Sequence, residues 1–185
     1  FASLVPNLAA IDIDLTSALP VSAVRMGGNP VSFTRPTDRI HVTLDNVYQP
    51  QQQFTVEIDY AGTPPPSTSF GGMVFTTHSG SPMAWTLSEP WDAKLWWPGK
   101  DVLGDKATFE IWLIHPNTMI GVSNGSLQGV DALAGNRLRS RWATNYPMVA
   151  YLASLAVTNY QRRTDTYTNL GANMPVEFYV FPESW

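Results

Sequence analysis

The stretch Ile40-His41-Val42-Thr43-Leu44 alternates apolar and polar side chains without a break. A period of two residues places the apolar side chains on one face of an extended strand and the polar ones on the other. The same alternation recurs at Ile11 to Leu15, Phe54 to Tyr60 and Thr108 to Leu113. These stretches are therefore expected to be half-buried β-strands, and they decide the fold class.

Turn-forming residues separate the strands along the chain. They lie at Gly27-Gly28-Asn29-Pro30, Gly62 to Pro66, Ser79 to Pro82 and Asn124-Gly125. The Asn-Gly pair favours a tight hairpin, so Ile120 to Val122 is expected to pair with Leu127 to Val130. Many short strands with such turns are typical of an all-β sandwich or barrel.

The rest of the chain continues in the same style. Strand-like runs follow at Leu138 to Thr144, Leu152 to Tyr160 and Val176 to Phe181, and no stretch predicts an amphipathic helix of usual length. The 15 Pro and 13 Gly are spread throughout, with neither a linker nor a repeat of fixed period. Residues 1–185 are therefore expected to form a single domain.

Composition excludes several classes of function. With 11 basic against 15 acidic side chains and a net charge of -4, no nucleic acid is expected as a partner. No apolar run is long enough for a membrane span. Cysteine is absent, which excludes disulfides, thiolate metal sites and a cysteine nucleophile. Because the chain begins at Phe1 and not at Met, it is expected to be a piece of a longer protein.

The sequence shows no catalytic or metal-binding motif. His41, His78 and His115 are widely spaced, and none belongs to a His-Glu-x-x-His pattern, so they are assigned no role. No serine lies in a Gly-x-Ser-x-Gly elbow, and no glycine pair has the context of a phosphate loop. The row Arg137, Arg139 and Arg141 lies on one face of a predicted strand, where it either binds phosphate or forms a solvated face. The solvated face is the favoured interpretation.

The segment Trp85 to Asp101 holds four of the seven tryptophans and one carboxylate next to a proline. Pro90 disfavours helical geometry at Glu89 and is expected to aim its carboxylate in a fixed direction. Glu89 is therefore a candidate ligand for a cationic group, and the alternative is an ion pair with a lysine. The three candidate lysines are Lys94, Lys100 and Lys106. For the tryptophans, packing in a core or a domain interface is favoured.

One stretch, from Thr86 to Phe109, aligns without a gap to a family pattern. It reads Thr-Leu-Ser-Glu-Pro-Trp-Asp-Ala-Lys-Leu-Trp-Trp-Pro-Gly-Lys-Asp-Val-Leu-Gly-Asp-Lys-Ala-Thr-Phe. This run resembles the pattern Thr-Gln-x-Glu-Ala/Pro-x-x-Ala-Arg-x-x-Phe-Pro-Cys-x-Asp-x-Pro-x-x-Lys-Ala-Thr-Phe of the aminopeptidase N family of zinc metallopeptidases, the gluzincin aminopeptidases. Val122 to Leu127 and Tyr146 to Leu152 are similar to later family motifs in the same order, and Ile11 to Val24 and Phe54 to Gly62 are similar to its opening strands.

The resemblance implies a saddle-like, antiparallel β-sandwich that is the amino-terminal domain before a zinc-peptidase catalytic domain. That catalytic domain is absent from this chain, so the chain alone is expected to hold no catalytic residue, no metal ligand and no cofactor. Zinc is implied in the absent domain, and the parent is expected to be a zinc-dependent aminopeptidase. In the family, the glutamate matching Glu89 binds the free amino terminus of the peptide substrate. The form Trp96-Trp97-Pro98 resembles secreted bacterial members, which implies a secreted or periplasmic location.

Among the positions that depart from the family pattern, three bear on the interpretation. Leu87 stands in place of a glutamine that also contacts the substrate, Gly99 in place of a cysteine and Leu103 in place of a proline. Two alternatives therefore stay open. One is a non-catalytic module that binds protein or carbohydrate through exposed rings of three of the segment's tryptophans, Trp91, Trp96 and Trp97. The other is a scaffold whose parent has a degenerate metal site.

Overall fold

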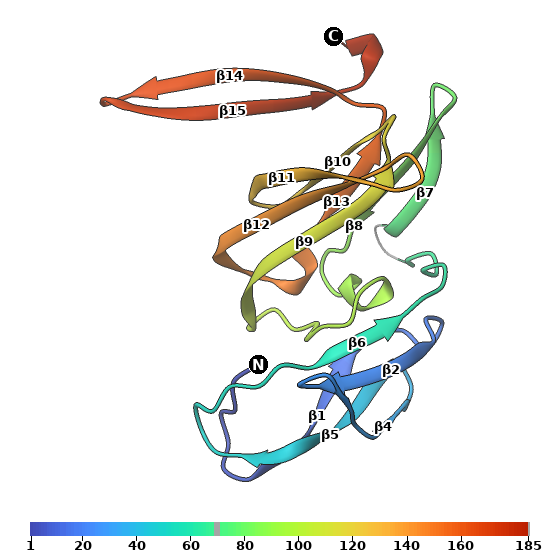
Figure 1. Ribbon diagram of the computed structural model, residues 1–185, viewed down its shortest axis with the longest axis vertical. Helices are drawn as coiled ribbons and strands as arrows, with labels where there is room; N and C mark the ends of the chain where they lie inside the picture. The colour runs from blue at the N-terminus through green and yellow to red at the C-terminus, as the bar shows by residue number, and fades with distance from the viewer. Residues whose placement is uncertain (69–70, 185) are drawn as a thin grey trace. The chain divides into compact units, whose positions relative to one another are not determined.

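The structure is a computed structural model that describes residues 1–68 and 71–184 (Figure 1). Strands make up 58% of it and helix 5%, all sheets are antiparallel, and the predicted all-β sandwich class is confirmed. The chain folds into two compact units. Unit 1 comprises residues 1–73, 87–107 and 148–153, and unit 2 comprises residues 74–86, 108–147 and 154–185. That residues 1–185 form a single domain before a catalytic domain stays a prediction.

Unit 1 contains two three-stranded sheets. Their orders are β1-β5-β4 and β3-β2-β6. The strands are β1 (Leu8–Asp14), β2 (Val21–Met26), β3 (Asn29–Pro30), β4 (Phe33–Thr34), β5 (Arg39–Tyr48) and β6 (Glu57–Tyr60). The predicted alternation along β5 is confirmed, because Ile40 and Val42 are 0% exposed and Leu44 is 8% exposed. These three side chains join the core of unit 1 with Ile13 of β1 and Val24 of β2.

Phe54 to Val56 were expected in the strand that β6 forms, but β6 begins only at Glu57. Phe54 pairs with Phe1 instead: its N–H donates to the Phe1 carbonyl at 3.0 Å, and the Phe1 nitrogen donates to the Phe54 carbonyl at 3.0 Å. The two rings stack with centroids 5.7 Å apart. Phe54 is 8% exposed and belongs to the core of unit 1.

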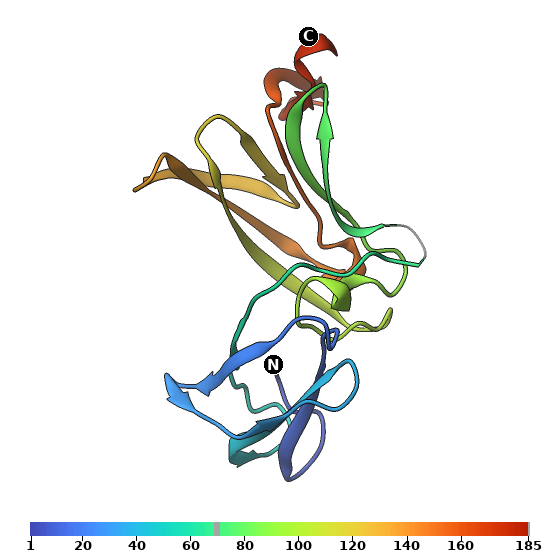
Figure 2. The same cartoon turned by 90° about the vertical axis from the view of Figure 1, so that its right-hand side faces the viewer.

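Unit 2 contains a four-stranded sheet, a three-stranded sheet and a hairpin. The orders are β10-β13-β8-β7, β11-β12-β9 and β14-β15. The strands are β7 (Gly72–His78), β8 (Ser81–Leu87), β9 (Lys106–Pro116), β10 (Ile120–Ser123), β11 (Ser126–Leu133), β12 (Arg137–Val149), β13 (Leu155–Thr158), β14 (Gln161–Asn169) and β15 (Ala172–Val180). Figure 2 shows strands β9, β11 and β12 in a layer separate from β7 and β8. The Trp142 indole of β12 donates to the Gly121 carbonyl of β10 at 3.1 Å and thereby joins the two sheets.

The hairpin predicted around Asn124-Gly125 is wrong, because β10 and β11 belong to different sheets. Asn124 Oδ1 accepts the Ser154 N–H at 2.7 Å, and Ser123 Oγ donates to the Ser154 carbonyl at 2.6 Å. The Asn-Gly pair therefore carries the chain from one sheet to the other. Gly125 has φ +86°, and a Cβ there would lie 2.0 Å from the Ala143 carbonyl oxygen.

The later strand predictions are confirmed in part. Leu138 to Thr144 lies inside β12, and Val176 to Phe181 overlaps β15, but β13 covers only Leu155–Thr158 of the predicted run from Leu152 to Tyr160. Three 3-10 helices of three residues each, η1 (Ala93–Leu95), η2 (Ala150–Leu152) and η3 (Pro182–Ser184), are the helices found within the described residues.

Candidate functional site

Glu89 lies exposed in the turn that follows β8, in unit 1. The residue before it, Ser88, is 2% exposed, and its Oγ accepts the indole N–H of Trp96 at 2.9 Å. The Ser88 carbonyl also accepts the N–H of Asp92 at 3.0 Å. The peptide bond between Glu89 and Pro90 is cis. The turn is therefore anchored on both sides of Glu89, while the carboxylate itself points to solvent.

The lysines considered as partners of Glu89 do not pair with it. Lys100 binds Asp105 at 3.0 Å instead, and no ion pair joins Glu89 to Lys94 or Lys106 among residues 1–68 and 71–184. Across residues 1–68 and 71–184, the Glu89 side chain makes no hydrogen bond or ion pair within the chain. Its carboxylate is accordingly available to a cation supplied from outside the chain.

A short 3-10 helix, η1, continues from the turn. Ala93 is 2% exposed, and its carbonyl accepts the N–H groups of Trp96 and Trp97, each at 3.2 Å. The side chain of Asp92 accepts a hydrogen bond from Ser67. These contacts fix the backbone from residue 92 to residue 97 relative to the turn that carries Glu89.

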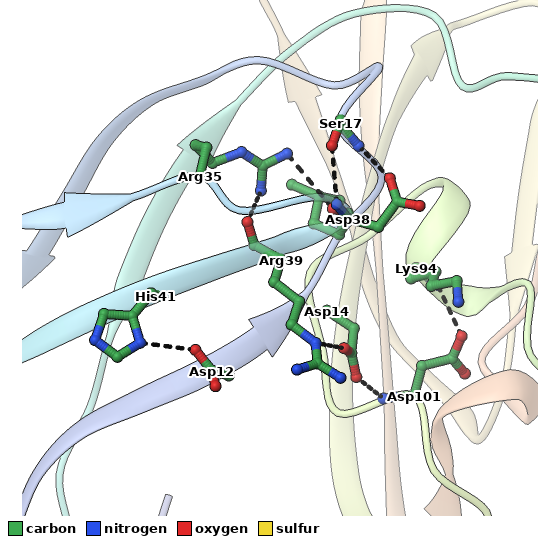
Figure 3. Close-up of polar contacts among 10 residues, drawn as sticks. Asp12, Asp14, Ser17, Arg35, Asp38, Arg39, His41, Lys94 and Asp101 are labelled. Carbon is green, nitrogen blue, oxygen red and sulfur yellow. Dashed lines mark hydrogen bonds and ion pairs between the residues drawn. The ribbon is translucent and has the colours of Figure 1, made fainter.

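The end of strand β1 holds the other end of the segment (Figure 3). Asp14 and Gly99 exchange backbone hydrogen bonds of 2.8 and 3.1 Å. The Asp14 carboxylate accepts the Asp101 N–H at 3.0 Å and lies 3.5 Å from Nε of Arg39. Asp101 in turn accepts the Lys94 N–H at 3.4 Å. The loop from residue 94 to residue 101 is thus tied to the sheet that forms the core of unit 1.

Burial shifts the pKa values of several groups in this region. It raises the pKa of the Asp101 carboxyl. The hydrogen bond from the Lys94 N–H and the Lys94 charge oppose this rise. Burial also raises the pKa of Tyr60, whose hydroxyl donates to the Trp96 carbonyl at 3.0 Å. Burial lowers the pKa of Arg35, whose guanidinium donates to the Thr16 carbonyl at 2.8 Å and to the Arg39 carbonyl at 3.0 Å. Asp101 and Tyr60 thus bind backbone groups of the loop from residue 94 to residue 101, whereas Arg35 binds carbonyls of residues 15–39.

The segment's tryptophans do not form a set of three exposed rings. Trp91 is 56% exposed, whereas Trp96 and Trp97 are half-buried with their ring centroids 6.1 Å apart. A Cβ at Gly99 would lie 2.8 Å from Cζ3 of Trp97. Glycine therefore gives the Trp97 ring its space, which accounts for the departure at Gly99. Leu87, the last residue of β8, is 42% exposed.

The three histidines lie in separate contacts. His41 binds Asp12 at 2.8 Å across strands β5 and β1, and His115 binds Ser140 at 2.9 Å inside unit 2. His78 binds Glu183 and stacks on the ring of Phe181 with centroids 3.7 Å apart. In the part of the chain that the structure describes, no three His, Cys, Asp or Glu side chains gather as a metal-binding group, so zinc has no donor set among these residues.

The structure also shows the contacts of the arginine row on β12 and bears on the question of a membrane span. Arg139 and Arg141 both bind the carboxylate of Asp131 on the neighbouring strand, at 2.8 and 3.0 Å. The Arg137 Nε–H donates to the Ala134 carbonyl at 3.1 Å. No helix among the described residues has both the length and the apolar character needed to cross a membrane.

Sequence comparison connects the chain to a family and to named relatives. The model of the peptidase M1 N-terminal domain matches residues 7–152. Aminopeptidase N of Haemonchus contortus is 28% identical over 130 residues, which is 67% of this chain and 13% of that protein. Glutamyl aminopeptidase of Rattus norvegicus is 30% identical over 100 residues, which is 54% of this chain and 10% of that protein. The chain therefore spans a small part of the length of these relatives.

Comparison with solved structures shows the same fold. A mutant M1 zinc metallopeptidase of Deinococcus radiodurans, bound to a Tyr-Ser-Ala substrate, matches 93% of this chain with a TM-score of 0.81 and 22% identity. This chain covers 40% of that protein. Aminopeptidase A of Legionella pneumophila, in complex with aspartic acid, matches 95% of this chain with a TM-score of 0.79 and 22% identity, and the chain covers 20% of it.

Proposed function

This chain belongs to the peptidase M1 N-terminal domain family, and from this premise we propose that it is the substrate-anchoring part of a zinc aminopeptidase. Glu89 binds the free amino terminus of the peptide, and the chain's partner is the catalytic domain of the parent protein, which holds the zinc. The chain alone performs no hydrolysis. Export from the cytoplasm, to the periplasm or outside the cell, is part of the same proposal.

The observation that supports this proposal is the state of the Glu89 side chain. Its carboxylate is exposed and makes no hydrogen bond or ion pair within residues 1–68 and 71–184, although the backbone on both sides of it is fixed. A carboxylate in a fixed position forms charge-assisted hydrogen bonds with an ammonium group, and these are about twice as strong as neutral ones. Such a group selects peptides by their free amino terminus, because a blocked terminus offers no charge to bind.

The exposed Leu87 changes what the site offers to a peptide. The family glutamine would present an amide that donates and accepts hydrogen bonds, whereas leucine presents only apolar surface. The side chain is 42% exposed and lies two residues before Glu89. We expect the recognition of the amino terminus to rest on Glu89 with little help from this position.

The test uses the full-length parent and aminoacyl p-nitroanilides. Glu89→Ala is expected to lower kcat/KM by about 10²-fold, the loss expected when one partner of a desolvated charge pair is removed. Glu89→Gln, which keeps the shape but not the charge, is expected to lose nearly as much. Glu57→Ala is the matched control, because Glu57 is an exposed glutamate of the same unit.

A des-amino substrate analogue separates anchoring from a general defect. Wild type is expected to prefer the amine-bearing substrate strongly, and Glu89→Ala is expected to lose that preference while its slow hydrolysis of the analogue stays unchanged. An active parent whose kcat/KM stays within twofold in Glu89→Ala would contradict the anchoring role. A parent that binds zinc but hydrolyses nothing would favour the scaffold or the binding module. The 56% exposure of Trp91 is the observation that supports the binding module.

A further inference from the structure

Two arginines of β12 share one carboxylate of β11. Asp131 accepts hydrogen bonds from Nε and Nη2 of Arg139 at 3.0 and 2.8 Å, and from Nε and Nη2 of Arg141 at 3.0 and 3.4 Å. Both guanidinium groups lower the pKa of the Asp131 carboxyl, and the hydrogen bond from Arg139 has the largest effect. The carboxyl therefore stays ionised. Two positive charges therefore face one negative charge, and the group as a whole stays positive.

Both guanidinium groups keep donors for a further ligand. An arginine carries five N–H donors, and here the hydrogen bonds to Asp131 use only Nε and Nη2. The Nη1 groups of Arg139 and Arg141 have no acceptor among residues 1–68 and 71–184. The side chains of Arg139 and Arg141 are 33% and 34% exposed, so part of each reaches the solvent.

An apolar strip on β9 lies beside the arginines. Strands β9, β12 and β11 are neighbours in one sheet, as Figure 1 shows. Trp112 is 56% exposed, and Cζ of Arg139 lies 4.8 Å from the centroid of its ring. Ile114, two residues further along and thus on the same face of β9, is 57% exposed. The Arg–Trp face is defined here as Trp112, Ile114, Asp131, Arg139 and Arg141.

Gly129 leaves the space that Arg141 occupies. It is the partner of Arg141 in the register of β11 and β12. A Cβ at this position would lie 2.7 Å from Nη2 of Arg141, so any larger residue would push the guanidinium away from Asp131. The position of this arginine therefore depends on the backbone of the neighbouring strand as well as on the carboxylate.

We propose that the Arg–Trp face is a docking surface for a partner protein that presents carboxylates beside apolar side chains. Tryptophan and arginine are the residues that most often dominate protein interfaces. The two remaining Nη1 groups fit a carboxylate, and Trp112 and Ile114 offer the adjoining apolar contact. Since the chain carries a net charge of -4, a positive face orients an acidic partner toward this sheet.

Other classes of ligand fit the face less well. The guanidinium of Arg139 covers part of the Trp112 ring that a sugar would stack on, and Ile114 extends the apolar strip beyond the ring. Nucleic acid binding needs several neutralised phosphates, whereas Asp131 cancels one of the two arginine charges. Arg137 lies on the same face of β12 as the two arginines, and Glu110 lies on the same face of β9 as Trp112. Their opposite charges cancel, so they add no net positive charge to the face.

The test is an NMR titration of the ¹⁵N-labelled chain with two acetylated peptides, Glu-Leu-Glu-Leu-Glu and Glu-Ser-Glu-Ser-Glu. The first peptide is expected to shift the indole N–H signal of Trp112 and the Nε–H signals of Arg139 and Arg141 in a saturable way. The second is expected to bind at least about tenfold more weakly, because it lacks the apolar contact. Shifts confined to other residues, or no saturable shift for either peptide, would overturn the proposal.

Variants locate the binding on the face. Trp112→Ala and Gly129→Ala are each expected to weaken binding by at least about tenfold, as truncation of an interface hot spot does. Gly129→Ala changes no charge and removes no ring, so it tests the position of Arg141 alone. Phe75→Ala, in an equally exposed aromatic of unit 2 at 58%, is the control and is expected to bind within twofold of wild type.

Two further results would overturn the proposal. If both Trp112→Ala and Gly129→Ala bind the Leu-containing peptide as tightly as wild type does, the face is not the docking surface. If an oligosaccharide of glucuronate saturates the Trp112 signal while neither peptide does, the face binds an acidic carbohydrate and not a protein.

Discussion

At the scale of single residues, Gly99 and Trp97 act as a pair. The ring of Trp97 lies where a Cβ of residue 99 would stand, with Cζ3 at 2.8 Å and Cη2 at 2.9 Å from it. The family pattern that this chain resembles has phenylalanine and cysteine at the corresponding positions. The family pattern combines a smaller ring with a larger neighbour, and this chain combines the larger ring of Trp97 with glycine. Both combinations fill a similar volume. The departure at Gly99 is explained by packing and does not bear on the chemistry at Glu89.

Gly99→Ala is expected to destabilise the chain by about 1 to 3 kcal/mol, since the half-buried indole cannot move aside freely. In the double variant Gly99→Ala with Trp97→Phe, the smaller ring is expected to remove the overlap. The double variant should then be more stable than the sum of the two single effects by roughly 1 kcal/mol. Urea unfolding of wild type, both single variants and the double variant measures this coupling energy, and strict additivity would contradict the pairing.

At the scale of elements, the turn between β10 and β11 depends on Gly125. Gly125 has φ +86°, and a Cβ there would overlap the Ala143 carbonyl oxygen at 2.0 Å. The neighbouring atoms are backbone, so no side-chain rotation relieves the overlap. Gly80 in the same unit has nearly the same φ, +82°, but no atom within 4 Å of its Cβ position. The two glycines therefore separate backbone strain from steric overlap.

Gly80→Ala is expected to lower the free energy of unfolding by about 1 kcal/mol, because alanine is less stable than glycine in the left-handed conformation. Gly125→Ala is expected to cost at least about 2 kcal/mol more, because overpacking adds to the same strain. The difference between the two free energies of unfolding, measured by urea denaturation, is the decisive quantity. Equal costs would mean that β10 and β11 are joined in another way.

The elements also show which parts of the fold local sequence can predict. Strand β5 was predictable because one of its faces is buried, and the alternation of Ile40, Val42 and Leu44 records that burial. Strand β14 was missed because all its residues are exposed, so no buried face leaves a pattern. The Asn-Gly turn was assigned to the wrong pairing, because its Asn124 side chain binds Ser154, thirty residues away.

The candidate site shows the same division. Pro90 and the family signature pointed to Glu89, whose place in a turn follows from its neighbours in sequence. The groups that hold this region were not predictable, because they come from distant parts of the chain: Asp14 binds the N–H of Asp101 across 87 positions. Trp96 is likewise held from a distance, because the Tyr60 hydroxyl donates to its carbonyl across 36 positions.

At the scale of the whole molecule, the chain passes repeatedly between its two compact units. It changes unit after Met73, Thr86, Ala107, Pro147 and Ala153. Neither unit is therefore built from one continuous segment, and each needs pieces of chain that lie between pieces of the other. Because the ends of every such piece are positioned by the other unit, losing the structure of one unit removes constraints from the other.

The two units are accordingly expected to unfold together, as the single domain predicted from the sequence would. Urea unfolding of the 5-fluorotryptophan-labelled chain, followed by ¹⁹F NMR, gives separate probes: Trp96 and Trp97 report on unit 1, and Trp112 and Trp142 report on unit 2. Cooperative unfolding requires that all four signals share one midpoint and one slope. If Trp96 and Trp97 share one midpoint and Trp112 and Trp142 share another, the two units unfold independently. They would then be two domains whose segments alternate along the chain.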